Sequence, residues 1–194
     1  MLRPVRFVQA DEDVFRANAK KFTDKTGVEI KVDFVGWEDI NQQTAVTSNS
    51  GAGPDIIIGF GDAPHIYIDK LIELTDVADY LDKRYGGWLA LAKRYGMRSK
   101  SKSWIGLPFG ASGGPLVYRK SLVNAAGFDK VPEDHAGILE LYKKLKAAGK
   151  PAGFALGNAV GDGNGFANWL LWSHNAALLD EEGNIIINSK ETIA

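Results

Sequence analysis

Carboxylate, amide and aromatic residues follow the predicted strands of this chain, and their types suit hydrogen bonding and ring stacking. In an open parallel sheet, ligands bind beyond the carboxyl ends of the strands. Planar polar groups hydrogen-bond hydroxyls, and ring faces pack on apolar C–H patches, so this mixture suits a polyhydroxy compound. The candidate ligand-binding residues are Gln9, Asp11, Glu12, Trp37, Phe60, Gly61, Asp62, Phe109, Asn158, Asp162, Asn164 and Trp169.

Several of these candidates have a structural alternative. Asp11 could equally cap the helix that follows the first strand, and Trp37 could fill the core. Trp169 and Trp172 lie three residues apart on one predicted helix, so we expect at least one of them in the core. Asp62 has the clearest case for ligand contact, because the short tripeptide that it ends is polar-tipped and follows a buried strand.

The sequence contains no complete motif for catalysis or metal binding. Gly59-Phe-Gly61 follows a strand, but Pro64 stands where a dinucleotide fingerprint requires its last glycine, and no P-loop or nucleophile-elbow serine is present. Asp162-Gly-Asn164 begins like a calcium loop, but the pattern breaks at Phe166. The three histidines are far apart and lack metal-spaced partners. We therefore expect no catalytic residue, no metal and no cofactor.

Composition excludes further classes of partner. Lys and Arg number 23 and Asp and Glu 24, which gives no electrostatic reason to expect nucleic acid or an anionic membrane. The chain has no cysteine, which removes disulfides and thiolate chemistry. No stretch is apolar enough to cross a bilayer. Met1-Leu-Arg-Pro4 leads straight into a strand, as in a cytosolic protein or one whose signal peptide has been removed.

The first part of the chain alternates strands and helices, which is typical of a doubly wound α/β fold. The apolar run in the third strand predicts burial on both faces. Predicted strands cover 5–9, 28–34 and 54–61. Predicted helices cover 11–27, 38–48, 63–72, 75–84 and 87–95.

Two extended segments at 104–109 and 116–119 flank a run of small residues rich in glycine and proline. This pattern predicts a hinge between two lobes, with a hairpin inside one domain as the alternative. We expect an N-terminal α/β lobe at 1–110, the hinge at 111–116 and the first part of a second α/β lobe at 117–194.

The second half begins a new alternation. Its predicted helices cover 121–126, 132–148 and 164–178, and its predicted strands cover 154–156, which should be buried, and 184–188. Ser189 would cap a further helix that the chain does not contain, which predicts a truncated chain.

Several stretches resemble, in order, the extracellular solute-binding proteins of bacterial ABC sugar importers, such as the maltose-, trehalose- and glycerol-phosphate-binding proteins. They are Gly53-Pro-Asp-Ile-Ile-Ile-Gly59, Ile68-Asp-Lys-Leu-Ile-Glu-Leu-Thr-Asp76, Ile105-Gly-Leu-Pro-Phe109, Leu116-Val-Tyr-Arg-Lys120 and Ala125-Ala-Gly127. The similarity spans nearly the whole chain, although Arg119 replaces the asparagine that is common in the hinge motif.

The resemblance implies a type II periplasmic-binding-protein-like fold, in which two lobes of doubly wound sheet close on a ligand at a hinge. It implies a sugar, polyol or oligosaccharide ligand and delivery to the permease subunits of an ABC transporter. It further implies a periplasmic or extracellular location, a removed signal peptide, a full length about twice that present, and a monomer at that length. The cleft residues vary within this group, so the candidate list rests on strand-end geometry.

Two other functions stay open. A sugar-acting α/β enzyme, a transferase or hydrolase, could use Asp11 and Asp62 as a carboxylate pair, and product formation would identify it. An interaction module, such as a chemoreceptor-docking protein, would bind a partner without a ligand.

Overall fold

The computed structural model describes residues 1–110, 116–158, 161–180 and 184–193. The chain divides into two compact units, Met1–Ser112 and Gly113–Ala194. The predicted hinge at 111–116 falls, apart from Leu116, outside the described residues, so the hinge and the lobe boundaries stay predictions.

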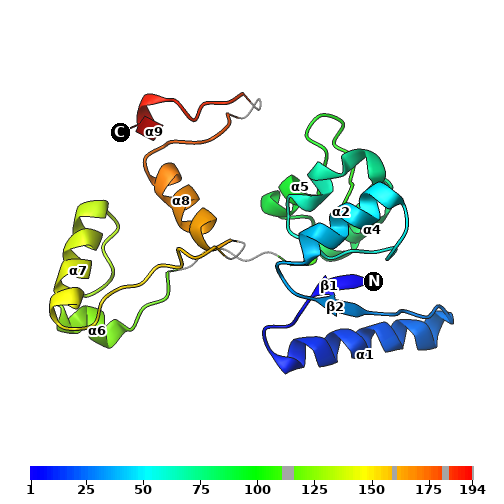
Figure 1. Ribbon diagram of the computed structural model, residues 1–194, viewed down its shortest axis with the longest axis horizontal. Coiled ribbons are helices and arrows are strands. Elements are labelled where there is room, and N and C mark those ends of the chain that lie inside the picture. Colours follow the sequence, from blue (N-terminus) through cyan, green and yellow to red (C-terminus); the bar gives the residue numbers. More distant parts are fainter. Residues whose placement is uncertain (111–115, 159–160, 181–183, 194) are drawn as a thin grey trace. The chain divides into compact units, whose positions relative to one another are not determined.

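A small parallel sheet lies at the centre of the first unit (Figure 1). β1 (Leu2–Pro4) pairs in parallel with β2 (Asp33–Val35), and Leu2 lies opposite Asp33. Along its other edge, Leu2 forms a parallel bridge with Ile57, through 2.9 Å bonds from Leu2 N to Ile56 O and from Ile58 N to Leu2 O. β1 is therefore flanked by two parallel neighbours.

The strands are shorter than predicted, and one is displaced. The prediction of a strand at 5–9 is wrong, because β1 ends at Pro4 and a helix begins at Gln9. Of 28–34, only the last two residues lie in β2, and 54–61 contributes one bridge at Ile57. Burial of that segment on both faces is also wrong, because Ile56 is 52% exposed. Alternation marks the residues able to form a strand, but pairing fixes where it ends.

Helices lie on both sides of this sheet, with α1 on one side and α2, α4 and α5 on the other (Figure 1). Glycines in the left-handed region end α1, α2 and α4, as at Gly27 with φ 76°. The predicted helices are confirmed with small shifts of their ends, except that 63–72 splits in two. The elements are α1 (Gln9–Thr26), α2 (Ile40–Ser50), α3 (Ala63–Ile66), the 3₁₀ helix η1 (Ile68–Lys70), α4 (Thr75–Tyr85) and α5 (Ala90–Gly96).

Trp104 anchors the core of this unit beyond the sheet. It is buried, and its ring lies 5.0 Å from that of Trp88. Its carbonyl accepts from Leu74 N at 2.7 Å, and its N–H donates to the Thr75 hydroxyl at 3.0 Å. These bonds tie the segment that follows α5 to the start of α4.

The second unit is mainly helical in its described part. It contains α6 (Lys120–Ala125), α7 (His135–Ala147), α8 (Asp162–Ser173) and α9 (Lys190–Ile193). α7 begins three residues later than predicted because Asp134 caps it, accepting from Gly137 N at 2.8 Å. The prediction that the chain does not contain the helix after Ser189 is wrong, because residues Lys190–Ile193 form the short α9.

Two strand predictions in this unit fail. Phe154 and Leu156 are exposed and lie in no strand, because no described segment pairs with them. Within 184–188, the only pairing among described residues is an antiparallel bridge between Leu179 and Ile185.

Candidate functional site

Three aromatic rings form a row in the first unit. Phe7 stacks on Trp37 with ring centroids 5.0 Å apart, and Trp37 packs against Phe60 at 5.6 Å. Phe7 follows β1, Trp37 follows β2, and Phe60 follows the segment that bridges β1 at Ile57. The aromatic row therefore lies beyond the carboxyl ends of three parallel segments, which is where ligands bind in open α/β sheets.

One end of the aromatic row is exposed to solvent, and its middle ring carries a buried hydrogen-bond donor. Phe7 is 84% exposed, whereas Trp37 and Phe60 are half-buried. The indole N–H of Trp37 is buried and has no acceptor among the described residues. An unsatisfied buried donor costs about 1–3 kcal/mol. A ligand whose oxygen accepts a hydrogen bond from this N–H would remove that cost and so bind more tightly.

Gly61 and Asp62 continue directly from Phe60. A Cβ at Gly61 would lie 2.6 Å from Cδ1 of Tyr95, so this position accepts only glycine without movement of that ring. Asp62 is exposed at the start of α3, and its side chain makes no capping bond there. Its carboxylate stands next to the aromatic row in the sequence and remains a candidate for hydroxyl groups of a ligand.

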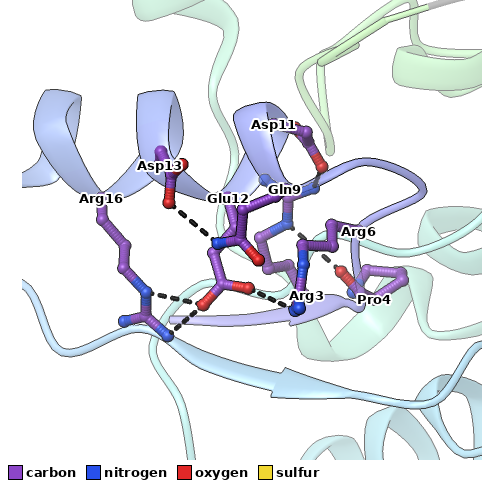
Figure 2. A network of polar contacts seen from close by, with 8 residues as sticks. All are labelled: Arg3, Pro4, Arg6, Gln9, Asp11, Glu12, Asp13 and Arg16. Carbon is purple, nitrogen blue, oxygen red and sulfur yellow. Dashed lines mark hydrogen bonds and ion pairs between the residues drawn. The ribbon is translucent and has the colours of Figure 1, made fainter.

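Gln9 and Glu12 lie in the first turn of α1 and make polar contacts within the chain (Figure 2). Glu12 forms ion pairs with Arg6 at 2.6 Å and Arg16 at 2.9 Å. The Gln9 amide donates to Asp13 at 2.9 Å. These two predicted ligand contacts therefore have partners in the chain itself.

Asp11 pairs with Arg3, from which its carboxylate accepts a bond of 2.6 Å (Figure 2). The prediction that Asp11 caps the helix is wrong, since Val8 is the N-cap residue and Asp11 lies inside the first turn. Arg3 is buried, with its guanidinium 4.5 Å from the Phe15 ring and 5.2 Å from the Phe34 ring. Asp11 thus compensates a buried cation.

Phe109 lies with Asp11 rather than in the aromatic row. Its ring meets that of Phe15 edge-on at 6.0 Å. Phe109 and Asp11 both line a groove of about 430 Å³ beside α1, whose other walls are mostly apolar. The structure therefore brings Trp37 together with Phe60, and Asp11 together with Phe109.

The remaining candidates belong to the second unit. Asp162 and Asn164 lie in the first turn of α8, and Asn158 is exposed in the segment before it. Trp169 lies further along α8, where its ring is 5.7 Å from Phe166 and 6.0 Å from His135. The expectation that Trp169 or Trp172 fills the core is wrong, because both are exposed, Trp172 by 66%. No described residue of α8 is buried, so the helix offers no core position to either ring.

Sequence reasoning missed Phe7. The pattern at 5–9 put this residue inside a strand, whereas the observed strand stops at Pro4 and leaves Phe7 beyond its end. Among the described residues, no cluster of three or more His, Asp or Glu could hold a metal ion. The described helices include none that is long and apolar enough to cross a membrane.

A family model for bacterial extracellular solute-binding proteins matches residues 9–194. The chain belongs to this family. No curated protein sequence matches it. The chain spans about half the length of each of the following solved structures.

A sugar transporter from Arthrobacter chlorophenolicus A6 with bound laminaribiose is 21% identical, with a TM-score of 0.77 over 99% of this chain and 49% of that one. Maltose-bound T. maritima MalE3 is 19% identical, with a TM-score of 0.72 over 100% of this chain and 50% of that one. An ABC transporter solute-binding protein from Agrobacterium radiobacter K84 in complex with ribitol is 22% identical, with a TM-score of 0.73 over 99% of this chain and 49% of that one. This solute-binding protein accordingly has an α/β, periplasmic-binding-protein-like fold.

Proposed function

We propose that the chain is part of the substrate-binding component of a bacterial ABC importer, and that it binds a sugar, polyol or oligosaccharide without changing it chemically. The observation that carries the proposal is the aromatic row of Phe7, Trp37 and Phe60 beyond the strand ends. Ring faces pack on the C–H faces of carbohydrates, and the family and the ligands of the matched structures agree with such a guest.

Polar groups beside the aromatic row would hydrogen-bond the hydroxyl groups of the ligand. The Trp37 indole N–H lacks an acceptor among the described residues, and the Asp62 carboxylate follows the row. Asn158, Asp162, Asn164 and Trp169 would contribute from the second unit. Ligand held by both units would shift an equilibrium between open and closed forms, which the permease subunits read. The site of action would be the periplasm or the extracellular face, and the complete protein would be a monomer.

No observation favours a sugar-acting enzyme. That alternative pairs Asp11 with Asp62, but the Asp11 carboxylate is bound to the buried Arg3. A carboxylate held in this way stabilises the fold and is poorly placed for proton transfer.

A thermal-shift screen of the complete protein tests the proposal. Sugars, polyols and their phosphates are added one at a time, and the melting temperature is recorded. Because a ligand that binds only the native state stabilises it by about 2.7 kcal/mol at a hundred times its Kd, one class should raise the melting temperature clearly. Equal melting temperatures with every compound would overturn the proposal, and a new product in the mixture would favour an enzyme.

A further inference from the structure

Two histidine side chains that are far apart in the sequence lie together in the second unit. His135 is the first residue of α7, and His174 is the C-cap residue of α8. Their ring centroids are 4.6 Å apart, and the ring planes are inclined by 46°. Both residues are exposed. The pair is therefore accessible to a solute, and the function proposed above makes no use of it.

A hydrogen bond fixes the orientation and the tautomer of His135. Its Nε2 lies 2.9 Å from the hydroxyl oxygen of Ser173. That hydroxyl donates its single hydrogen to the Leu170 carbonyl at 2.7 Å, so Nε2 of His135 carries the proton and donates to Ser173. In the neutral ring, Nδ1 then holds a lone pair. Within the described part of the chain, Nδ1 of His135 has no hydrogen-bond partner, and neither ring nitrogen of His174 has one.

This arrangement is the usual one for a histidine that binds a metal ion. Such a histidine coordinates through one ring nitrogen and donates from the other to a fixed acceptor, which holds the ring in place. Ser173 is that acceptor for His135, and the bond to Leu170 holds the Ser173 hydroxyl in turn. His135 is therefore oriented as a metal ligand, with Nδ1 as the coordinating atom.

The spacing of the two rings agrees with coordination of one ion at a right angle. With metal–nitrogen bonds of about 2.0–2.1 Å, two imidazoles bound at 90° have ring centroids roughly 4.5 Å apart, and at the tetrahedral angle roughly 5.2 Å. The observed separation of 4.6 Å matches the right angle. Right angles between neighbouring ligands are typical of the square-planar and tetragonal sites of Cu²⁺ and Ni²⁺, for which imidazole is a good ligand.

The helix ends beside the pair are compatible with a cation. His174 lies at the C-terminal end of α8, where the helix dipole favours positive charge. The N-terminal end of α7 has the opposite effect, but Asp134 places its carboxylate there as the N-cap residue. The two effects offset each other, so the rings and their lone pairs decide what binds.

We propose that His135 and His174 form a two-histidine site for a divalent transition-metal ion, with Cu²⁺ preferred. Nδ1 of His135 and one ring nitrogen of His174 are the protein ligands, and water molecules complete the coordination. Cu²⁺ is preferred because it binds nitrogen ligands most tightly among the divalent ions of its row and accepts right-angled ligands. The site shares no residue with the aromatic row, and the inference does not depend on the proposed function.

Titration of the complete protein with Cu²⁺, in the absence of sugar, tests the proposal. Isothermal titration measures the Kd, and electron paramagnetic resonance counts the nitrogen atoms bound to the ion. His135→Ala and His174→Ala each remove one ligand, and Ser173→Ala removes the acceptor that orients His135. His65→Ala is the matched control, because His65 belongs to the first unit and donates to the Arg94 carbonyl at 3.0 Å. Mg²⁺, which prefers oxygen ligands, is the control ion.

We expect His135→Ala and His174→Ala each to raise the Kd for Cu²⁺ at least about tenfold and to reduce the bound imidazoles from two to one. Ser173→Ala keeps both imidazoles but should still raise the Kd about tenfold, because the ring of His135 loses its fixed orientation. His65→Ala should bind Cu²⁺ as the unmodified protein does, and Mg²⁺ should not bind. Melting temperatures without metal should hardly change, since the replaced residues are exposed.

Two outcomes would overturn the proposal. If both alanine variants bind Cu²⁺ as the unmodified protein does, the pair holds an adventitious ion only. If just one of the two weakens binding, a single surface imidazole is the ligand and the two rings do not act together. His135→Gln and His174→Gln, which keep a polar side chain of similar length, replace any alanine variant that fails to fold.

Discussion

The ring of Phe7 stacks on that of Trp37 at a centroid distance of 5.0 Å and an interplanar angle of 25°. Phe7 follows β1 and Trp37 follows β2, two strands that pair in parallel from Leu2 opposite Asp33 to Pro4 opposite Val35. The pairing register therefore brings together two rings that lie 30 residues apart in the sequence. Phe60 extends the same row from the third parallel segment.

Phe7→Ala should weaken sugar binding with little effect on stability. Phe7 is 84% exposed, so its truncation removes little buried area. Loss of one stacked ring costs about 0.5–1.5 kcal/mol, or roughly a 2- to 13-fold rise in Kd. Isothermal titration of the complete protein with the sugar found in the screen measures the change. The exposed neighbour Val8→Ala is the control and should bind as the unmodified protein does.

Trp37→Phe tests the contribution of the indole N–H to binding separately from that of the aromatic ring. The variant keeps an aromatic face but removes the buried donor that has no acceptor among the described residues. If a ligand oxygen accepts from Trp37, the Kd should rise about 2- to 13-fold, which corresponds to the loss of a hydrogen bond of about 0.5–1.5 kcal/mol. The ligand-free melting temperature should hardly fall, because an unsatisfied group disappears together with part of the ring. An unchanged Kd would show that the indole N–H does not meet the ligand.

The helices could be predicted from the sequence because their signals are local. Apolar spacing along α1 and the left-handed Gly27 that ends it depend on neighbours within one turn. The strands could not be delimited in the same way. Alternation at 5–9 resembles a strand, but the partner residues Asp33–Val35 pair with Leu2–Pro4 instead.

The same difference between local and long-range signals applies to the residues of the candidate site. Trp37 and Phe60 could be placed because each follows a strand pattern closely. Phe7 was missed because its place depends on where β1 ends. The ion pair of Asp11 was not predicted because its partner Arg3 lies in the strand before the helix. Neither relationship has a signature in the residues immediately around it.

Asp11→Asn should destabilise the protein without a specific loss of sugar affinity. The Asp11 carboxylate binds a guanidinium whose side chain is 8% exposed, and Asp11 itself is 38% exposed. Loss of a partner from a fully buried pair costs about 3–5 kcal/mol, so partial exposure should reduce the cost to roughly 1–3 kcal/mol. Urea unfolding measures the change.

A matched control is available on the same helix. Asp24→Asn removes a carboxylate from the exposed pair with Lys20 and should change the free energy of unfolding by less than about 1 kcal/mol. If Asp11→Asn instead leaves stability intact and abolishes sugar binding, Asp11 is a ligand contact, as the sequence first indicated.

Gly61→Ala should destabilise the first unit by crowding Tyr95. The new Cβ would lie 2.6 Å from Cδ1 and 2.7 Å from Cε1 of that ring, well inside van der Waals contact. Overpacking of this kind typically costs about 1–3 kcal/mol, which urea unfolding would detect. Gly110→Ala is the matched control, because no atom of the described residues lies within 4 Å of a Cβ built there, and it should unfold at the same urea concentration as the unmodified chain. Since Gly61 links Phe60 to Asp62, the displacement should also raise the Kd for the sugar, whereas a variant that retains both stability and affinity would show that Tyr95 moves aside freely.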